Sequence, residues 1–231
     1  MWIDVHLDSI KKETESTWRF FIKISNSNNF SFKAGQFIQI KIGDLVRSYS
    51  IASLPNNKNI IELIIVKLDG GKMSNYLFNK IKIRKKFQIK GPLGKFILPE
   101  ELDRDLFFIS TGTGIAPFRS MLYYIKTNNI KHRKIFIIFG TRLKKDILYY
   151  DEMIKLSSMK NIIYIPTLSR EKWKGNTGYV HSIYEKILNE KKDLMNPLFY
   201  LCGWRNMIKE ARNKLKNFGI DSKSVKLEIY G

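Results

Sequence analysis

The sequence predicts a two-domain fold, an antiparallel β-barrel domain followed by an α/β domain built on a parallel sheet. Three observations lead to this prediction. The 231 residues are enough for two modest domains. Short β-like runs separated by turn residues fill the first hundred positions, and strands alternate with helices in the remainder. The rhythm changes after Gly91-Pro92-Leu93-Gly94, so we place the domains at residues 1–100 and 101–231, with the boundary between Leu98 and Asp103.

The first domain is expected to be a small antiparallel barrel or sandwich. Its β-like runs are Trp18–Ile24, Gln36–Ile42, Ser48–Ser53 and Ile60–Val66. Turn-forming spacers separate them at Ser25–Asn29, Ala34-Gly35 and Pro55–Asn59. Short strands at this spacing are typical of both architectures. One helix is expected at Lys72–Lys80, opened by Gly70-Gly71.

In the second domain, strand-like and helix-like segments alternate, which indicates a parallel sheet with crossover helices. The strands are expected at Leu106–Ser110, Lys134–Phe139, Ile162–Pro166, Leu198–Cys202 and Ser224–Ile229. The helices are expected near Ala116–Lys126, Leu148–Ser157, Val180–Leu188 and Asn206–Phe218. Ligands of such sheets bind beyond the carboxyl ends of the strands, so the residues that follow each strand matter most.

Composition excludes several kinds of protein. Cys202 is the one cysteine, so the chain holds neither a disulfide framework nor a four-cysteine metal site, and its three histidines are scattered without ligand spacing. We therefore expect no metal. The longest apolar run, around Ile60–Val66, is broken by Glu62 and falls short of the roughly 18 residues of a membrane span. The N-terminus has early acids and no signal-peptide pattern, so we expect a cytoplasmic protein.

The net charge of +20 implies attraction to an anion, whether nucleic acid, an acidic protein, a phosphorylated cofactor or an acidic membrane surface. Isoleucine, asparagine and lysine are abundant together along the whole chain, which indicates a general compositional bias. Arginine, the better reader of bases, is the rarer cation. Charge alone therefore favours no particular partner.

Three short segments are candidates for binding a phosphate-bearing ligand. Ser110-Thr111-Gly112-Thr113-Gly114-Ile115-Ala116-Pro117 follows a strand and opens a helix, where glycines permit close approach and the helix start offers free N–H groups. Gly70-Gly71-Lys72-Met73-Ser74-Asn75 is a second glycine-rich helix start. Arg47-Ser48-Tyr49-Ser50 sets an arginine and an aromatic residue on one face of a strand. Taken singly, each is also compatible with an ordinary turn, cap or surface strand.

In order along the chain, these segments resemble the ferredoxin–NADP reductase family. The similarity extends from about Phe32 to the C-terminus and includes Cys202-Gly203 and the closing Glu228-Ile229-Tyr230. It implies that Arg47 binds the FAD pyrophosphate, that Tyr49 stacks on the isoalloxazine and that Ser50 hydrogen-bonds near flavin N5. The helix start that cradles the pyrophosphate would consist of Gly71, Lys72, Met73 and Ser74.

The resemblance also assigns residues to the nicotinamide dinucleotide. Thr113 and Gly114 would meet it, and Arg142, in Phe139-Gly140-Thr141-Arg142, is a candidate for a cofactor phosphate or a plain exposed arginine. Cys202 would lie by the nicotinamide C4 and flavin N5, with Glu228 nearby. Tyr230 would cover the other flavin face, although the chain continues to Gly231, unlike plant-type members.

Two segments of the sequence favour different nucleotides. Ser169-Arg170-Glu171 matches the segment that grips the 2′-phosphate in NADPH-using members, and a hydroxyl with a guanidinium suits that group. Trp173–Val180 looks more like oxygenase reductases, many of which use NADH. Tyr179 could stack on the adenine of either nucleotide. We favour NADPH, with NAD possible.

The expected function is therefore that of an FAD-dependent oxidoreductase that transfers hydride between NADPH and FAD and single electrons to or from ferredoxin or flavodoxin. Its partner would be an acidic one-electron carrier. A basic run could steer that carrier, and it consists of Lys80, Lys82, Arg84, Lys85, Lys86 and Lys90. Alternatively, this run is only a solvated edge of the domain. The alternative is an NADH-dependent reductase component of an oxygenase, or a flavin reductase. A basic nucleic-acid-binding protein is a distant third, because no recognised nucleic-acid module is present.

Overall fold

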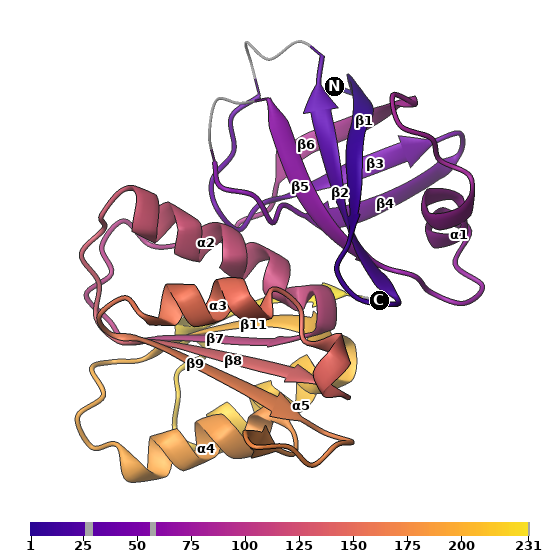
Figure 1. Ribbon diagram of the computed structural model, residues 1–231. Coiled ribbons are helices and arrows are strands. Elements are labelled where there is room, and N and C mark those ends of the chain that lie inside the picture. Colours follow the sequence, from indigo (N-terminus) through magenta and orange to yellow (C-terminus); the bar gives the residue numbers. More distant parts are fainter. Residues whose placement is uncertain (26–29, 56–58, 231) are drawn as a thin grey trace. The chain divides into compact units, whose positions relative to one another are not determined.

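The computed structural model describes residues 1–25, 30–55 and 59–230 (Figure 1). Contacts divide the chain into two compact units, Met1–Leu98 with Ala116–Asn128, and Pro99–Ile115 with Asn129–Gly231. The domain boundary drawn between residues 100 and 101 stays a prediction, and the contacts add that helix α2 (Ala116–Thr127) groups with the first unit. Parts of the predicted spacers Ser25–Asn29 and Pro55–Asn59 lie outside the described residues.

The first unit contains an antiparallel sheet of six strands, in the order β4-β3-β6-β1-β2-β5 (Figure 1). Its strands are β1 (Ile3–Lys12), β2 (Thr17–Ile24), β3 (Phe37–Ile42), β4 (Leu45–Ser50), β5 (Ile60–Val66) and β6 (Lys86–Leu93). A bridge between Ile51, just after β4, and Leu63 of β5 joins the two ends of this order. The predicted antiparallel β domain is confirmed, and this bridge favours the barrel over the sandwich.

Period-2 burial builds the barrel core, as it should in strands with one face inward. In β1, Val5 and Leu7 are buried, whereas His6 between them is only partly buried. They join Phe20, Ile38 and Leu63 in one cluster of buried side chains. Helix α1 (Lys72–Asn79) adds its inner face to the same cluster.

Three sequence expectations in this unit were incomplete. Strands β1 and β6 were not anticipated, and the run expected at Ser48–Ser53 is a strand only as far as Ser50. The chain turns there because the Ile51 amide donates to the Gln36 carbonyl at 3.0 Å and the Ala52 amide to the Glu62 carbonyl at 2.8 Å. The backbone thus leaves β3 and crosses to β5.

The second unit contains a parallel sheet in the order β10-β9-β8-β7-β11-β12. Its strands are β7 (Leu106–Thr111), β8 (Ile135–Thr141), β9 (Ile162–Leu168), β10 (Asn176–Thr177), β11 (Leu198–Trp204) and β12 (Val225–Tyr230). The central strands are apolar along most of their length because both faces are covered. The predicted α/β parallel-sheet domain is confirmed.

Helices α3 (Tyr150–Ser157), α4 (Val180–Glu190) and α5 (Arg205–Asn217) cover this sheet, with α3 on one face and α4 and α5 on the other (Figure 1). The buried face of α4 and α5 packs on Phe107, Phe136 and Phe199. The first strand, β7, lies in the interior of the sheet, with β8 on one side and β11 on the other. Strand order therefore reverses between β7 and β11, the position where sheets of this kind bind ligands.

Among the described residues, no helix is both long and apolar enough to span a bilayer.

Candidate functional site

Strand β4 presents Arg47, Tyr49 and Ser50 in three different environments. Arg47 is exposed, and its Nη1 donates to the Val46 carbonyl at 2.7 Å. Burial raises the pKa of Tyr49 from 10.0 to about 12, and the Arg47 charge opposes that rise only in part. Ser50, the last residue of the strand, is buried. At neutral pH this strand end therefore offers a solvent-facing cation beside a neutral phenol.

Helix α1 begins without a side-chain cap and without an acid in its first turn. The first N–H groups of a helix have no partner inside it, so this start is open to an anion. Gly71 precedes the helix, and a Cβ there would stand 3.2 Å from Leu68 and Ser74 atoms, which leaves little room for any other residue. Helix α1 contacts β4, so the helix lies beside the strand that carries Arg47.

The remaining residues of this start have different tasks. Lys72 is exposed, whereas Met73 points into the barrel core. The buried Ser74 hydroxyl accepts a hydrogen bond from the Leu68 amide at 2.7 Å and so holds the preceding turn. The main-chain N–H groups and Lys72 are what the helix start offers to a phosphate.

At the point where strand order reverses, two glycines bring β7 and β11 together. The chain leaves β7 through a 3₁₀ turn, Gly112–Ile115, that leads into α2. A Cβ on Gly114 would stand 2.2 Å from the Cys202 carbonyl oxygen, and one on Gly203 would stand 2.4 Å from the Thr111 hydroxyl oxygen. Gly114 therefore allows the turn after β7 to pack closely against the main chain of β11, a role that the motif alone did not reveal. Thr113 lies in the same turn and is partly exposed.

Two buried hydroxyl groups and an exposed indole lie at these strand ends. The Ser110 and Thr111 hydroxyl oxygens are buried and have no hydrogen-bond partner within the described part of the chain. Trp204, the last residue of β11, is 51% exposed although tryptophan usually buries its ring. The sequence placed Thr111 in a candidate phosphate-binding segment without giving its hydroxyl a role, and it did not single out Trp204, whose position directly at a strand end was the available signal.

Cys202 is fully buried in β11, level with Glu228 of β12. Burial raises the pKa of its thiol well above the ordinary value, the Glu228 charge adds to the rise, and a hydrogen bond with Tyr230 opposes it. Thiols act as nucleophiles through the thiolate, so this one is neutral and unreactive at physiological pH. The structure thus brings Cys202, Glu228 and Tyr230 together at the carboxyl end of the sheet.

A second group lies at the carboxyl ends of β8 and β9. Arg170 follows β9, and its amide donates to the Arg142 carbonyl beyond β8 at 3.1 Å. Both arginine side chains are exposed. The Ser169 hydroxyl donates to the Thr141 carbonyl at 3.3 Å, a long contact. Three of the predicted residues therefore sit on adjoining strand ends.

Two neighbours complete this group. The Glu171 carboxylate accepts the Lys144 amide at 2.7 Å, which ties the nearest acid to the β8 loop. Tyr179 precedes α4 and is 72% exposed, and the Gly178 amide beside it donates to the Leu168 carbonyl at the end of β9 at 2.8 Å. An exposed phenol ring thus follows a backbone segment that is hydrogen-bonded to the end of β9, the strand that Ser169 and Arg170 follow.

Comparison with known proteins supports two ligand-binding domains. Residues 4–97 match the family described as oxidoreductase FAD-binding domain, and residues 108–213 match oxidoreductase NAD-binding domain. Among curated proteins, the chain is 31% identical over 214 residues to ferredoxin–NADP reductase B of Sorangium cellulosum, covering 87% of this chain and 86% of that protein.

Two further similarities concern a larger relative and a solved structure. The chain is 33% identical over 218 residues to CDP-6-deoxy-L-threo-D-glycero-4-hexulose-3-dehydrase reductase of Yersinia pseudotuberculosis, covering 93% of this chain but only 64% of that protein. Its fold matches the crystal structure of a ferredoxin NADP⁺ reductase from Neisseria gonorrhoeae with bound FAD and NADP, at a TM-score of 0.83 and 23% identity over 99% of this chain and 98% of the other.

Proposed function

Because the chain belongs to the ferredoxin–NADP reductase family and carries FAD- and NAD-binding oxidoreductase domains, we propose that it transfers hydride between NADPH and FAD and exchanges single electrons with ferredoxin or flavodoxin. The observation that supports the nucleotide choice is the pair of exposed arginines, Arg142 and Arg170, on adjoining strand ends. A 2′-phosphate is the part of NADPH that two such groups would recognise.

The residues of the first unit fit an FAD pyrophosphate. The exposed Arg47 guanidinium and the uncapped start of α1 at Gly71 supply a cation and main-chain donors on two neighbouring elements. Tyr49 would stack on the isoalloxazine as a neutral phenol, and Ser50 would hydrogen-bond near N5. Bound FAD supplies the ability to accept a hydride and release its electrons singly.

The residues of the second unit fit the nicotinamide dinucleotide. The Thr111 hydroxyl, without a partner in the described chain, stands at the end of β7 beside the turn that carries Thr113 and Gly114. Cys202 would shape the nicotinamide site as a neutral thiol and would not act as a base. Glu228, level with Cys202, would take part in proton traffic, and Tyr230 would cover one flavin face.

NADH sites commonly set a carboxylate against the free ribose hydroxyls. Glu171 is the acid nearest to Arg170 in the chain, and its carboxylate is already engaged with the Lys144 amide at 2.7 Å. We therefore assign Ser169, Arg170 and Arg142 to the 2′-phosphate and Tyr179 to the adenine ring. The competing assignment is an NADH-dependent reductase component of an oxygenase, or a flavin reductase, and in the sequence it rests on the Trp173–Val180 resemblance.

The test is kcat/KM for NADPH and NADH with ferricyanide as acceptor. Arg170→Ala should lower kcat/KM for NADPH about tenfold to a hundredfold, the worth of one charge-assisted contact, and leave NADH nearly unchanged. Lys172→Ala, which removes another exposed cation of the same loop, is the matched control and should change neither. A parent enzyme that prefers NADH contradicts the assignment and favours the oxygenase-reductase alternative.

The acidic carrier is proposed to dock on the loop between α1 and β6. The cations of this loop and of the following strand are all exposed: Lys80, Lys82, Arg84 and Lys85, with Lys86 and Lys90 in β6. A hollow of about 400 Å³ lies beside them, lined in part by Lys41, Lys85 and Lys86. Exposed Ile83 adds an apolar contact in the middle of the run. A partner rich in carboxylates fits such a surface.

Reversing charge there should slow electron transfer to the carrier without touching the flavin. Lys85→Glu with Lys86→Glu should weaken reduction of ferredoxin or flavodoxin, most at low salt, while ferricyanide reduction stays as in the parent. Lys155→Glu with Lys160→Glu, which reverses two exposed lysines of the second unit, is the control with the same change in net charge. Equal effects of both changes would show that only net charge matters. The cytoplasmic location stays a proposal from sequence.

A further inference from the structure

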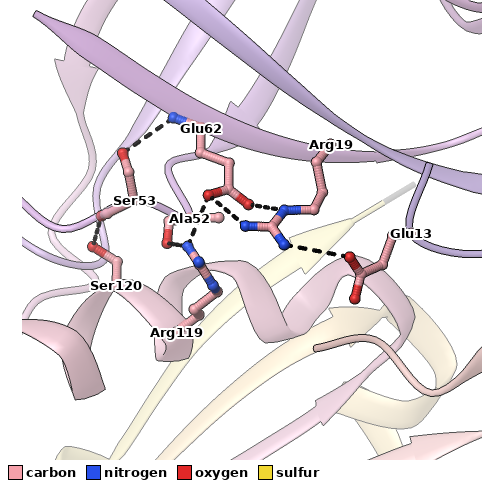
Figure 2. Close-up of polar contacts among 7 residues, drawn as sticks. All are labelled: Glu13, Arg19, Ala52, Ser53, Glu62, Arg119 and Ser120. Atoms are coloured by element: carbon pink, nitrogen blue, oxygen red, sulfur yellow. Dashed lines mark hydrogen bonds and ion pairs between the residues drawn. The ribbon is translucent and has the colours of Figure 1, made fainter. Parts of the chain in front are cut away.

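A buried ionic cluster, made of residues that the proposed function does not use, lies inside the first unit. Glu62 of β5 is 4% exposed and meets two arginines (Figure 2). Arg19 of β2 donates through Nε and Nη2 to the two carboxylate oxygens, at 2.6 and 3.1 Å. Arg119 of α2 donates through Nη1 to Glu62 Oε2 at 3.0 Å. A second carboxylate, Glu13, stands 3.5 Å from Arg19 Nη1, so the formal charges balance.

The same cluster fastens helix α2 to the backbone that follows β4. Arg119 Nη1 also donates to the Ala52 carbonyl at 2.8 Å, and the neighbouring Ser120 hydroxyl donates to the Ser53 carbonyl at 2.6 Å (Figure 2). The Ser53 hydroxyl in turn accepts the Glu62 amide at 3.1 Å. Two successive residues of α2 therefore hold two successive carbonyls, and Glu62 supports both ends of the contact.

Stability alone is a weak explanation for this arrangement. Removing charged groups from water costs free energy that offsets much of the attraction between them. Apolar residues of similar volume often stabilise a core equally well or better. Such a cluster does supply directional hydrogen bonds, which hold donor and acceptor groups at defined distances and angles. The two arginines differ in what they fix. Arg19 joins two strands of the barrel, whereas Arg119 joins the barrel to α2.

The two ends of this contact adjoin two proposed cofactor-binding segments in the chain. Ala52 and Ser53 follow Ser50 at the end of β4. Arg119 lies one turn into α2, which continues directly from the Gly112–Ile115 turn. Displacement of α2 would thus be passed along the backbone to that turn.

We propose that Arg119 is a positioning residue for hydride transfer: with Glu62 and the Ala52 carbonyl as its acceptors, it fixes the start of α2 and, through it, the turn that carries Thr113 and Gly114. This inference rests on the proposed function for its kinetic consequence, but not for its structural one. Arg119 touches no cofactor in this role; it acts through the helix.

The test compares Arg119→Met with Arg19→Met, since each variant removes one arginine from the same carboxylate. Two quantities are measured for both: the rate of flavin reduction at saturating NADPH, per bound FAD, and amide hydrogen exchange in peptides that cover residues 51–53 and 112–120. Arg119→Met should slow reduction about tenfold to a hundredfold, because small displacements of reacting groups cost that much. It should also speed exchange in both peptides. Arg19→Met should lower the melting temperature while leaving both quantities near the parent's.

A second variant, Arg119→Lys, allows the same test if Arg119→Met folds poorly. Arg119→Lys keeps the charge and can reach one acceptor at a time, so it should shift both measurements in the same direction by less. Equal effects of Arg119→Met and Arg19→Met, or none from either, overturn the proposal. If the parent holds no FAD or is not reduced by NADPH, the proposed function fails instead, and the exchange measurement still decides whether Arg119 holds α2 against the backbone that follows β4.

Discussion

Replacing Gly114 with alanine would place a methyl group where the end of β11 already lies. The added Cβ would stand 2.2 Å from the Cys202 carbonyl oxygen, 2.7 Å from its carbonyl carbon and 3.0 Å from the Gly203 nitrogen. All three are main-chain atoms, so no side chain can rotate out of the way. The turn after β7 and the end of β11 must therefore move apart.

The size of that movement sets the expected effect. Ordinary contact of a Cβ begins at 3.4 Å, so the two main chains must separate by roughly 1 Å. Overpacking of this kind costs about 1–3 kcal/mol. At roughly 2–4 °C per kcal/mol for a chain of this size, the melting temperature should fall by about 2–12 °C. A shift of about 1 Å beside the nicotinamide site should slow hydride transfer on the order of a hundredfold.

Thermal unfolding followed by circular dichroism and stopped-flow reduction by NADPH measure the two effects. FAD content should stay near the parent's, because Gly114 belongs to the other unit from Arg47 and α1. Gly71→Ala is the control, and we expect it to weaken FAD binding more than it slows hydride transfer. The added Cβ would stand 3.2 Å from its neighbours, which belong to the first unit. A Gly114→Ala protein with unchanged melting temperature and unchanged reduction rate would refute the packing argument.

Three further predictions concern single residues. Arg47→Ala should weaken FAD binding about tenfold to a hundredfold through loss of a charge-assisted contact, measured by equilibrium dialysis of the flavin; unchanged affinity would remove Arg47 from the pyrophosphate site. Cys202→Ala should slow flavin reduction at saturating NADPH with FAD content intact, and the parent's rate should show no thiol titration below pH 9.0, since burial raises the pKa of that thiol; a loss of folding alone would make Cys202 only a core residue. The pKa of Tyr49 rises from 10.0 in the unfolded chain to about 12 on folding, so the phenol's contribution to stability is complete below pH 10.0 and declines as pH rises towards about 12. Between these pH values the free energy of unfolding, measured with urea, should therefore fall less steeply with pH for Tyr49→Phe than for the parent. An identical fall for both proteins would contradict the pKa shift.

The fold could be predicted from the sequence where one local pattern decided the structure. Strands β7, β8 and β11 are apolar over most of their length and alternate with helices, a combination with few other solutions. Strands β1 and β6 were missed because alternating charged residues reduce the apolar signal, although Val5 with Leu7 and Phe87 with Ile89 kept the period of two. The end of β4 depends on hydrogen bonds to Gln36 and Glu62, which local sequence does not reveal.

The candidate site divides in the same manner. Glycine-rich segments marked the helix starts at Gly71 and Gly112 because their spacing is local. The role of Gly114 depends on Cys202, a residue far along the chain, and stayed hidden until the strands were placed. Glu62 illustrates the limit most clearly: within its apolar run it only interrupts the pattern, yet its partners lie 43 and 57 residues away.

The central claim is that this chain holds FAD and reduces it with NADPH. The most direct measurement is the absorbance spectrum of the purified protein, with flavin identity determined after release, followed by anaerobic titration with NADPH and with NADH. We expect FAD equimolar with the chain and loss of the oxidised-flavin absorbance at far lower concentrations of NADPH than of NADH. A colourless protein that takes up no FAD, a protein that holds FMN instead, or a bound flavin that neither nucleotide reduces would contradict it.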